Sequence, residues 1–281
     1  MQRTVTAHIT ATIRSTSELA WSVVAATSAD PTTEQLSITV NGSELDVTEV
    51  AGSGGARWHF VEAVPVGEFA LIYNATLASG GAASELTPGE RISYLRPSRY
   101  ADVDRLESTA RALFADVGSQ GADGDGDAGS EADDVALLHA VTNYVADHTA
   151  YVIGSSRVTD GASDTYLARA GVCRDFAHLT IALLRARGVP ARLVSAFAPG
   201  LQPMDFHAVV EAYVAGAWHV VDPTRLAPRQ SLVRIATGTD AAETAFMTTH
   251  SGITNFGTLT VTATTDGPLP QDDHQGLIQI G

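Results

Sequence analysis

The sequence contains no lysine and only one cysteine, and its 17 basic residues, all arginine, stand against 32 acidic ones, for a net charge of −15. This balance argues against binding to nucleic acid or to anionic membrane surfaces. A single cysteine excludes an internal disulfide and a paired-cysteine metal or redox site. No apolar run reaches the roughly 20 residues of a membrane-spanning helix, and the N-terminus lacks a signal-peptide core. We therefore expect a cytoplasmic protein with no membrane partner.

Strand patterns dominate the first 95 residues. Residues 4–14 alternate strictly between apolar and polar side chains, which is typical of a half-buried strand. Further strands are expected at 36–40, 58–61 and 69–77. Asn41-Gly42 after the first of these indicates a tight hairpin turn, because both residues tolerate a positive φ. The pattern predicts an antiparallel β-sandwich domain over residues 1–95.

Helical periodicity begins near residue 100. Apolar residues recur at spacings of three and four over 103–114 and again over 135–145, which predicts two helices. Between them, the acidic segment 118–134 contains aspartates at alternating positions. As an EF-hand loop starting at Asp123 it would have Ala128 and Asp134 where glycine and glutamate are required. We interpret this segment as a mobile acidic loop rather than a cation site.

The only cysteine falls at the start of another predicted helix. An apolar stripe that includes Phe176, Leu179 and Leu183 predicts a helix from Cys173 to the Gly188 region. Backbone N–H groups and the helix dipole favour a thiolate at such a position, and the same N–H groups could stabilise an oxyanion. A lone cysteine on a helix is more often a packing residue, so this segment alone does not establish catalysis.

A hairpin further along the chain supplies two partners for this thiol. If Ala215-Gly216 is a two-residue turn, His207 pairs with Thr224, and Asp222 is the diagonal neighbour of His207 on the same face. Taken singly, these residues read as an ordinary strand histidine and a strand-ending aspartate. Together with Cys173 they favour a nucleophile, a base and an orienting carboxylate, a Cys-His-Asp triad.

Several segments resemble the bacterial transglutaminase-like superfamily. They are Gly171–His178 (GVCRDFAH), Arg187–Arg192 (RGVPAR), the strand that opens with His207, and Trp218–Thr224 (WHVVDPT). Residues 94–100 resemble the interdomain segment of two-domain bacterial members. Residues 238–243 resemble a later family segment, with Thr239 and Glu243 where the family usually has Arg and Asp. The resemblance covers about residues 94–250.

This resemblance implies an α+β, papain-like transglutaminase core behind the N-terminal β-sandwich. It makes Cys173 the nucleophile, His207 the general base and acid, and Asp222 the residue that orients His207. Asp175 and His178 lie inside the matched cysteine motif, and we interpret them as buried hydrogen-bonding residues near the site.

The domain boundaries then follow from the patterns. We expect the β-domain over 1–95, the catalytic domain over 96–266 with a late strand at 258–264, and a disordered acidic tail over 267–281.

The expected function is hydrolysis of an amide or peptide bond through an acyl-enzyme, or transamidation if an amine replaces water. We favour hydrolysis because the sequence shows no feature for binding an acceptor. Two alternatives stay open: a thioester-using acyltransferase of the arylamine N-acetyltransferase kind, and a non-catalytic binding module that retains the triad. The expected partner is a peptide or amide substrate, and no metal or organic cofactor is implied.

Overall fold

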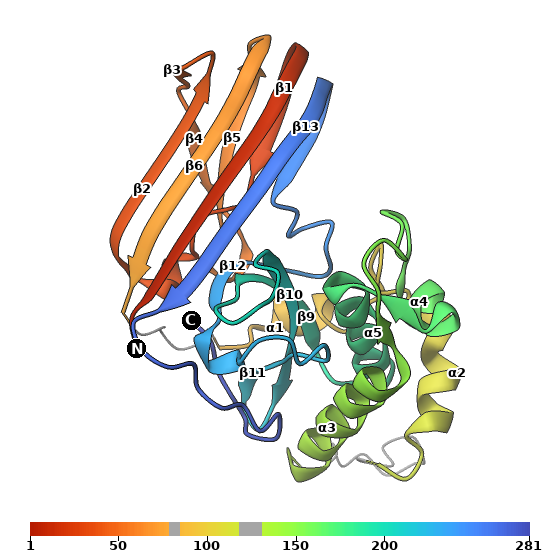
Figure 1. Ribbon diagram of the computed structural model, residues 1–281. Helices are drawn as coiled ribbons and strands as arrows, with labels where there is room; N and C mark the ends of the chain where they lie inside the picture. The colour runs from red at the N-terminus through yellow and green to blue at the C-terminus, as the bar shows by residue number, and fades with distance from the viewer. Residues whose placement is uncertain (79–84, 118–130) are drawn as a thin grey trace.

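The structure is a computed structural model that describes residues 1–78, 85–117 and 131–281. Most of the predicted acidic loop, 118–134, lies outside the described residues, and so do its alternating aspartates. The described residues form a long antiparallel sheet, a four-stranded sheet, a two-stranded parallel pair and a group of helices (Figure 1). The α+β class expected from the sequence is confirmed.

The N-terminal part is one curled antiparallel sheet. Its strands are β1 (Arg3–Trp21), β2 (Pro31–Val40), β3 (Ser43–Glu44), β4 (Thr48–Ala51), β5 (Arg57–Val64), β6 (Gly67–Leu77) and β13 (Met247–Thr265), with short 3-10 turns at Thr27–Ala29 and Ser53–Gly55. The predicted antiparallel β-domain is confirmed. Its strands join in one sheet instead of the two sheets of a sandwich, because β1 is long enough to pair with β6 and then with β5 along its length.

The last strand of this sheet comes from the C-terminal part of the chain. The sequence indicated a strand only over 258–264, assigned to the catalytic domain, whereas β13 extends over 19 residues and pairs with β1 from end to end. Residues 247–257 are mostly exposed on both faces. They therefore lack the polar–apolar alternation that marks a half-buried strand.

The second part contains the helices and the smaller sheets. The helices are α1 (Pro88–Ser93), α2 (Val103–Leu113), α3 (Glu131–His148), α4 (Ala162–Ala168) and α5 (Cys173–Ala186). The four-stranded sheet has the order β11 (Ala217–Val221), β10 (Phe206–Val214), β9 (Ala191–Phe197), β12 (Val233–Gly238). This part of the molecule also contains a short parallel pair, β7 (Ala150–Tyr151) and β8 (Ala170–Gly171), and a 3-10 turn at Arg229–Ser231.

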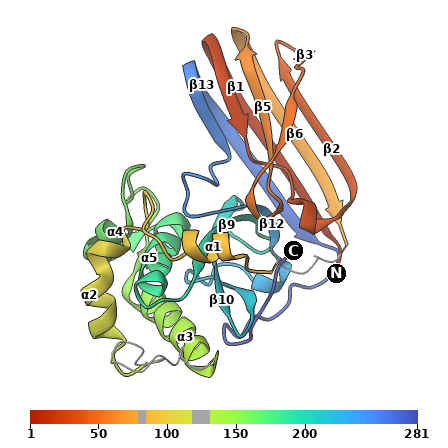
Figure 2. The same ribbon diagram turned by 180° about the vertical axis from the view of Figure 1, so that it is seen from behind.

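The four-stranded sheet lies between the helices and the N-terminal sheet, as both views show (Figures 1 and 2). On one side, α5 is buried from Asp175 to Ala186 and contacts β9 and β10. On the other side, Phe197, Val233 and Ile235 share an apolar core with the N-terminal sheet. The two parts therefore meet through buried apolar surface, which fixes residues of β1 and β13 next to those of β9, β10 and β12.

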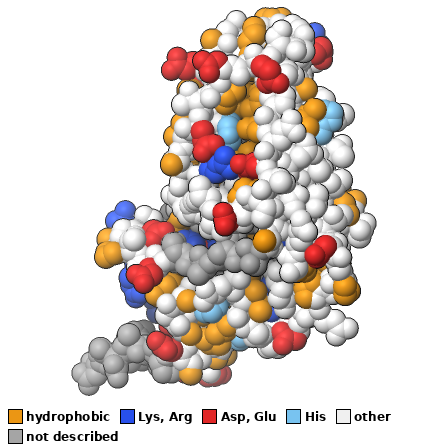
Figure 3. All heavy atoms as spheres, turned by 90° about the vertical axis from the view of Figure 1, so that its left-hand side faces the viewer, with side chains coloured by type: hydrophobic (Ala, Val, Ile, Leu, Met, Phe, Trp, Pro, Cys, Tyr) orange, Lys and Arg blue, Asp and Glu red, His pale blue; other side chains and the backbone are white. Residues whose placement is uncertain are grey.

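On one face of the molecule the acidic side chains are scattered. On the face shown in Figure 3, acidic side chains lie over both the sheet and the lower part of the molecule instead of forming one patch. None of the helices in the described parts of the chain has the length and apolar character that crossing a lipid bilayer requires.

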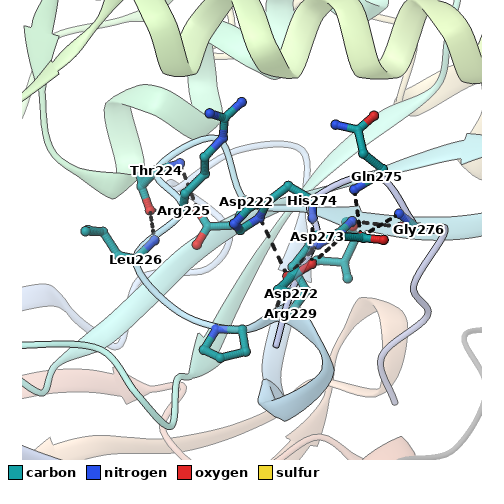
Figure 4. Close-up of polar contacts among 12 residues, drawn as sticks. Asp222, Thr224, Arg225, Leu226, Arg229, Asp272, Asp273, His274, Gln275 and Gly276 are labelled. Carbon is teal, nitrogen blue, oxygen red and sulfur yellow. Dashed lines mark hydrogen bonds and ion pairs between the residues drawn. The ribbon is translucent and has the colours of Figure 1, made fainter. Parts of the chain in front are cut away.

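The segment 267–281, expected from the sequence to be a disordered tail, makes buried contacts with the second part of the molecule. The buried Arg229 guanidinium makes an ion pair with the buried Asp272 carboxylate at 2.7 Å and donates to the Gly276 carbonyl at 3.0 Å (Figure 4). Arg234, also buried, donates to the Ile280 carbonyl at 2.8 Å. Two buried cations therefore have acceptors on this segment, and composition alone does not reveal such long-range contacts.

Candidate active site

Cys173 is the first residue of α5, as the sequence predicted, and its free thiol is half-buried. Val172 before it is extended. Asp175 caps this helix end, because its carboxylate accepts a hydrogen bond from the Val172 N–H at 2.8 Å. The thiol therefore lies at a helix N-terminus that is stabilised by a buried capping residue.

The hairpin brings His207 and Asp222 together. The strand register has Val214 opposite Ala217, as a two-residue turn requires. His207 Nε2 and Asp222 Oδ2 are 2.8 Å apart, and both side chains are fully buried. Thr224 supports the carboxylate, since its hydroxyl and its backbone N–H donate to Asp222 Oδ1 at 2.7 and 2.9 Å.

The second ring nitrogen of His207 is left without a partner in the described part of the chain. His207 Nδ1 is buried and has no hydrogen-bond partner among the described residues, and the nearby Cys173 thiol influences the pKa of His207. Burial lowers the pKa of His207, but the Asp222 carboxylate and the Cys173 thiol outweigh burial and raise this pKa to about 10. Burial would raise the pKa of Asp222, yet the charge of His207 and hydrogen bonds from His207 and Thr224 lower it overall. An imidazolium–carboxylate pair is therefore the stable form near neutral pH.

Tyr151, on β7, also contacts the cysteine and was not predicted. The backbone and the thiol of Cys173 both influence the pKa of its hydroxyl. Burial, followed by the nearby Cys173 charge, raises the pKa of Tyr151 to about 12, so the phenol stays protonated. The two-residue strand Ala150–Tyr151 carries no periodic signal, and its pairing with Ala170–Gly171 is what brings the phenol to the site.

Asp175 and His178, both part of the cysteine motif, are buried and hydrogen-bonded. Besides capping α5, the Asp175 carboxylate accepts from the Ser156 hydroxyl at 2.8 Å. His178 Nε2 accepts from the Ala241 N–H at 3.2 Å, and its ring stacks on Tyr100. Burial lowers the pKa of His178 to about 3, which leaves a neutral imidazole.

Cys173 and His207 line a cavity of about 540 Å³ between the two parts of the molecule. The N-terminal sheet contributes Ser22, which follows β1, and Met247 and Leu259 of β13 to its wall. Its size is within the usual range for binding sites of small ligands. Among the described residues, no three His, Cys, Asp or Glu side chains are grouped closely enough to hold a metal ion.

The family model of the transglutaminase-like superfamily matches residues 126–223, a range that includes Cys173, His207 and Asp222. The crystal structure of a candidate cysteine protease from Cytophaga hutchinsonii is similar to this chain over nearly its whole length. The two share 30% sequence identity and a TM-score of 0.81, with 99% of this chain and 96% of that chain covered. The chain belongs to the transglutaminase-like superfamily.

Shorter matches to this transglutaminase-like chain occur in mycobacteria. An uncharacterized protein of Mycobacterium leprae is 35% identical over 85 residues, and one of Mycobacterium bovis is 40% identical over 63 residues. These matches span 29% and 20% of the two relatives. They therefore support a shared segment rather than a shared architecture.

Proposed function

We propose that this transglutaminase-like protein is a cysteine-dependent hydrolase of amide or peptide bonds that works through an acyl-enzyme. The observation that carries the proposal is the buried His207–Asp222 pair, whose free ring nitrogen is left for Cys173 at the start of α5. The similarity to a candidate cysteine protease supports the same reaction class.

In the form of the site that reacts, the proton of the Cys173 thiol resides on His207. Asp222 stabilises this imidazolium on its other side. The Cys173 sulfur then attacks the substrate carbonyl carbon, and the oxyanion that forms is stabilised at the N-terminus of α5. When the carbon–nitrogen bond breaks, His207 gives its proton to the leaving amine, and the acyl group remains on sulfur as a thioester.

Deacylation uses the same groups in reverse. His207, now neutral, takes a proton from water as the water oxygen attacks the thioester carbonyl. The carbon–sulfur bond breaks, the carboxylic acid leaves, and the proton stays on His207 beside the released sulfur of Cys173, which restores the starting form of the site. With an amine in place of water the product is a new amide, and we propose water as the principal acceptor.

The test is exposure to a peptide library followed by mass spectrometry of products and of the protein. We expect cleaved peptides and a covalent acyl adduct on Cys173, with an acyl transfer product appearing only when an amine is added. Cys173→Ala is the control and should give neither cleavage nor adduct. Cleavage that persists in Cys173→Ala, or a wild-type protein that forms no adduct and no product, would overturn the proposal.

We further propose that residues 96–246 make up the catalytic unit and that β13 belongs with the N-terminal sheet, given its pairing with β1. The cytoplasmic location expected from the sequence stays a prediction.

A further inference from the structure

A second cavity lies beside the catalytic one, on the side of the N-terminal sheet. Its volume is about 390 Å³, within the range of ligand-binding pockets. Aromatic side chains from two strands dominate its wall: Trp21 at the end of β1, and Trp58 and Phe60 on β5. His250 of β13 closes it on another side, with its ring edge-on to Phe60.

The two cavities share part of their walls. Ser22 and Ala245 line both of them, so two small side chains mark the boundary between the catalytic cavity and the aromatic pocket. Ser22 is 2% exposed, and its hydroxyl has no hydrogen-bond partner among the described residues. Its backbone N–H donates to the Phe246 carbonyl at 3.1 Å. An unpaired buried hydroxyl at such a junction is suited to a polar group of a ligand that crosses it.

The aromatic pocket is held in shape by its own packing. Trp21 is buried and stacks on Phe69, with the ring centres 5.1 Å apart and the planes nearly parallel. The Trp58 ring packs closely against Gly52, where an added Cβ would lie 3.1 Å from the ring. A pocket built this way needs little rearrangement to accept a ligand.

We propose that the aromatic pocket is a side-chain subsite for the substrate of Cys173, and that it selects peptides with a large apolar or aromatic residue near the scissile bond. This inference rests on the proposed hydrolase activity. An extended peptide held at Cys173 would cross the Ser22–Ala245 boundary, with a backbone group near the Ser22 hydroxyl and one side chain among the three aromatic rings. Contacts between aromatic rings and the removal of apolar surface from water both favour such an occupant.

A cationic occupant fits this pocket less well. Among the described residues Glu243 is the only carboxylate in its wall, and that carboxylate already accepts a hydrogen bond from the Thr239 N–H at 2.7 Å. His250 faces the pocket as well and carries positive charge when protonated. An aromatic wall can bind a cation, so lysine is included as a separate arm of the test.

The experiment measures cleavage of octapeptides in which Phe, Leu, Lys or Glu is placed at each position of an otherwise alanine-rich sequence. We expect Phe and Leu to raise kcat/KM by about tenfold or more at one position and little elsewhere. Trp58→Ala removes one of the aromatic rings of the wall, and Val50→Phe fills part of the pocket. Each should bring the ratio of kcat/KM for Phe to kcat/KM for alanine at that position towards one. Ile72→Ala, an exposed β6 residue outside both cavities, is the control and should keep the preference.

Thermal unfolding of each variant verifies that it folds. If one of the two pocket variants does not fold, the other still tests the subsite. Cleavage without any position that favours Phe or Leu, a preference for Lys instead, or a Phe preference retained in both pocket variants would overturn the subsite. Absence of cleavage of every peptide by wild type would instead overturn the proposed hydrolase function.

Discussion

His207 carries the charge on which the proposed chemistry depends, and iodoacetamide alkylation of Cys173 reports on it directly. Cys173 is the only cysteine, so all alkylation at sulfur belongs to it. The pKa of His207, raised to about 10, predicts an imidazolium beside the thiol at pH 6. We therefore expect wild type to be alkylated at pH 6, and we expect the alkylation rate of His207→Ala to be lower by about tenfold or more. Coincident pH profiles of the two proteins would show that the residues are uncoupled and would favour a binding module.

Asp222 is predicted to act by fixing the tautomer of His207. Asp222→Asn keeps the shape of the side chain but removes the charge that stabilises the imidazolium. The equivalent change in serine proteases lowers kcat by about 10⁴-fold, and we expect a loss of several orders of magnitude here. The measurement is kcat as a function of pH, with circular dichroism to verify the fold. A variant that retains wild-type kcat would remove Asp222 from the mechanism.

Tyr151 is predicted to support the oxyanion near the Cys173 N–H, since the backbone and the thiol of Cys173 both influence the pKa of its hydroxyl. Tyr151→Phe should lower kcat by about 10²-fold with a small change in KM, as the loss of one oxyanion donor does in other enzymes. Tyr213→Phe is the matched control, because its hydroxyl only donates to the Gly216 carbonyl in the hairpin turn. Equal kcat values for the two variants would limit Tyr151 to packing.

At the scale of elements, His178 links α5 to the segment that lines both cavities. It accepts from the Ala241 N–H while buried and neutral, and burial lowers its pKa to about 3. An unfolded histidine titrates near pH 6.5, so this residue stabilises the fold above pH 6.5, and the contribution is lost as the pH falls towards 3. His178→Gln retains an acceptor but cannot titrate.

Urea unfolding at several pH values measures this effect. Between pH 7 and 4 we expect the free energy of unfolding to fall more steeply in wild type than in His178→Gln, since the other titrating groups are common to both. Parallel curves would show that His178 does not carry the acid sensitivity assigned to it.

At the scale of the whole molecule, the C-terminal segment 267–281 is held against the proposed catalytic unit by buried contacts. Asp272 pairs with Arg229, and both side chains are almost fully buried. Burial would raise the pKa of Asp272, but hydrogen bonds from the Arg229 side chain and backbone lower it overall. Removing one charge from a buried pair costs about 3–5 kcal/mol, because the other is left uncompensated.

Asp272→Asn should therefore unfold at a clearly lower denaturant concentration than wild type. Asp273→Asn is the matched control. The Asp273 carboxylate is mostly exposed, so this substitution should change the unfolding midpoint little. Equal midpoints for the two variants would mean that the segment does not hold the fold in the way that its contacts indicate.

Local patterns in the sequence determined much of the catalytic geometry. The apolar stripe after Cys173 predicted its helix, and the Ala215-Gly216 turn set the register that brings Asp222 to His207. Both follow from short-range rules, in which helical spacing and turn length decide which side chains share a face. The cysteine motif and the hairpin could therefore be interpreted without knowledge of the rest of the chain.

Only the tertiary structure decided which segments that are far apart in the sequence contact each other. The pairing of β13 with β1, the contacts of the segment 267–281 with Arg229, the approach of Tyr151 to Cys173 and the aromatic pocket all depend on contacts between distant segments. These contacts leave no periodic pattern in the sequence. Exposed strand residues need not alternate between polar and apolar, and the carboxylate that pairs with a buried arginine is set by the fold. The sequence by itself determined the residues of the proposed triad, whereas packing of the N-terminal sheet against β9, β10 and β12 built the walls around them.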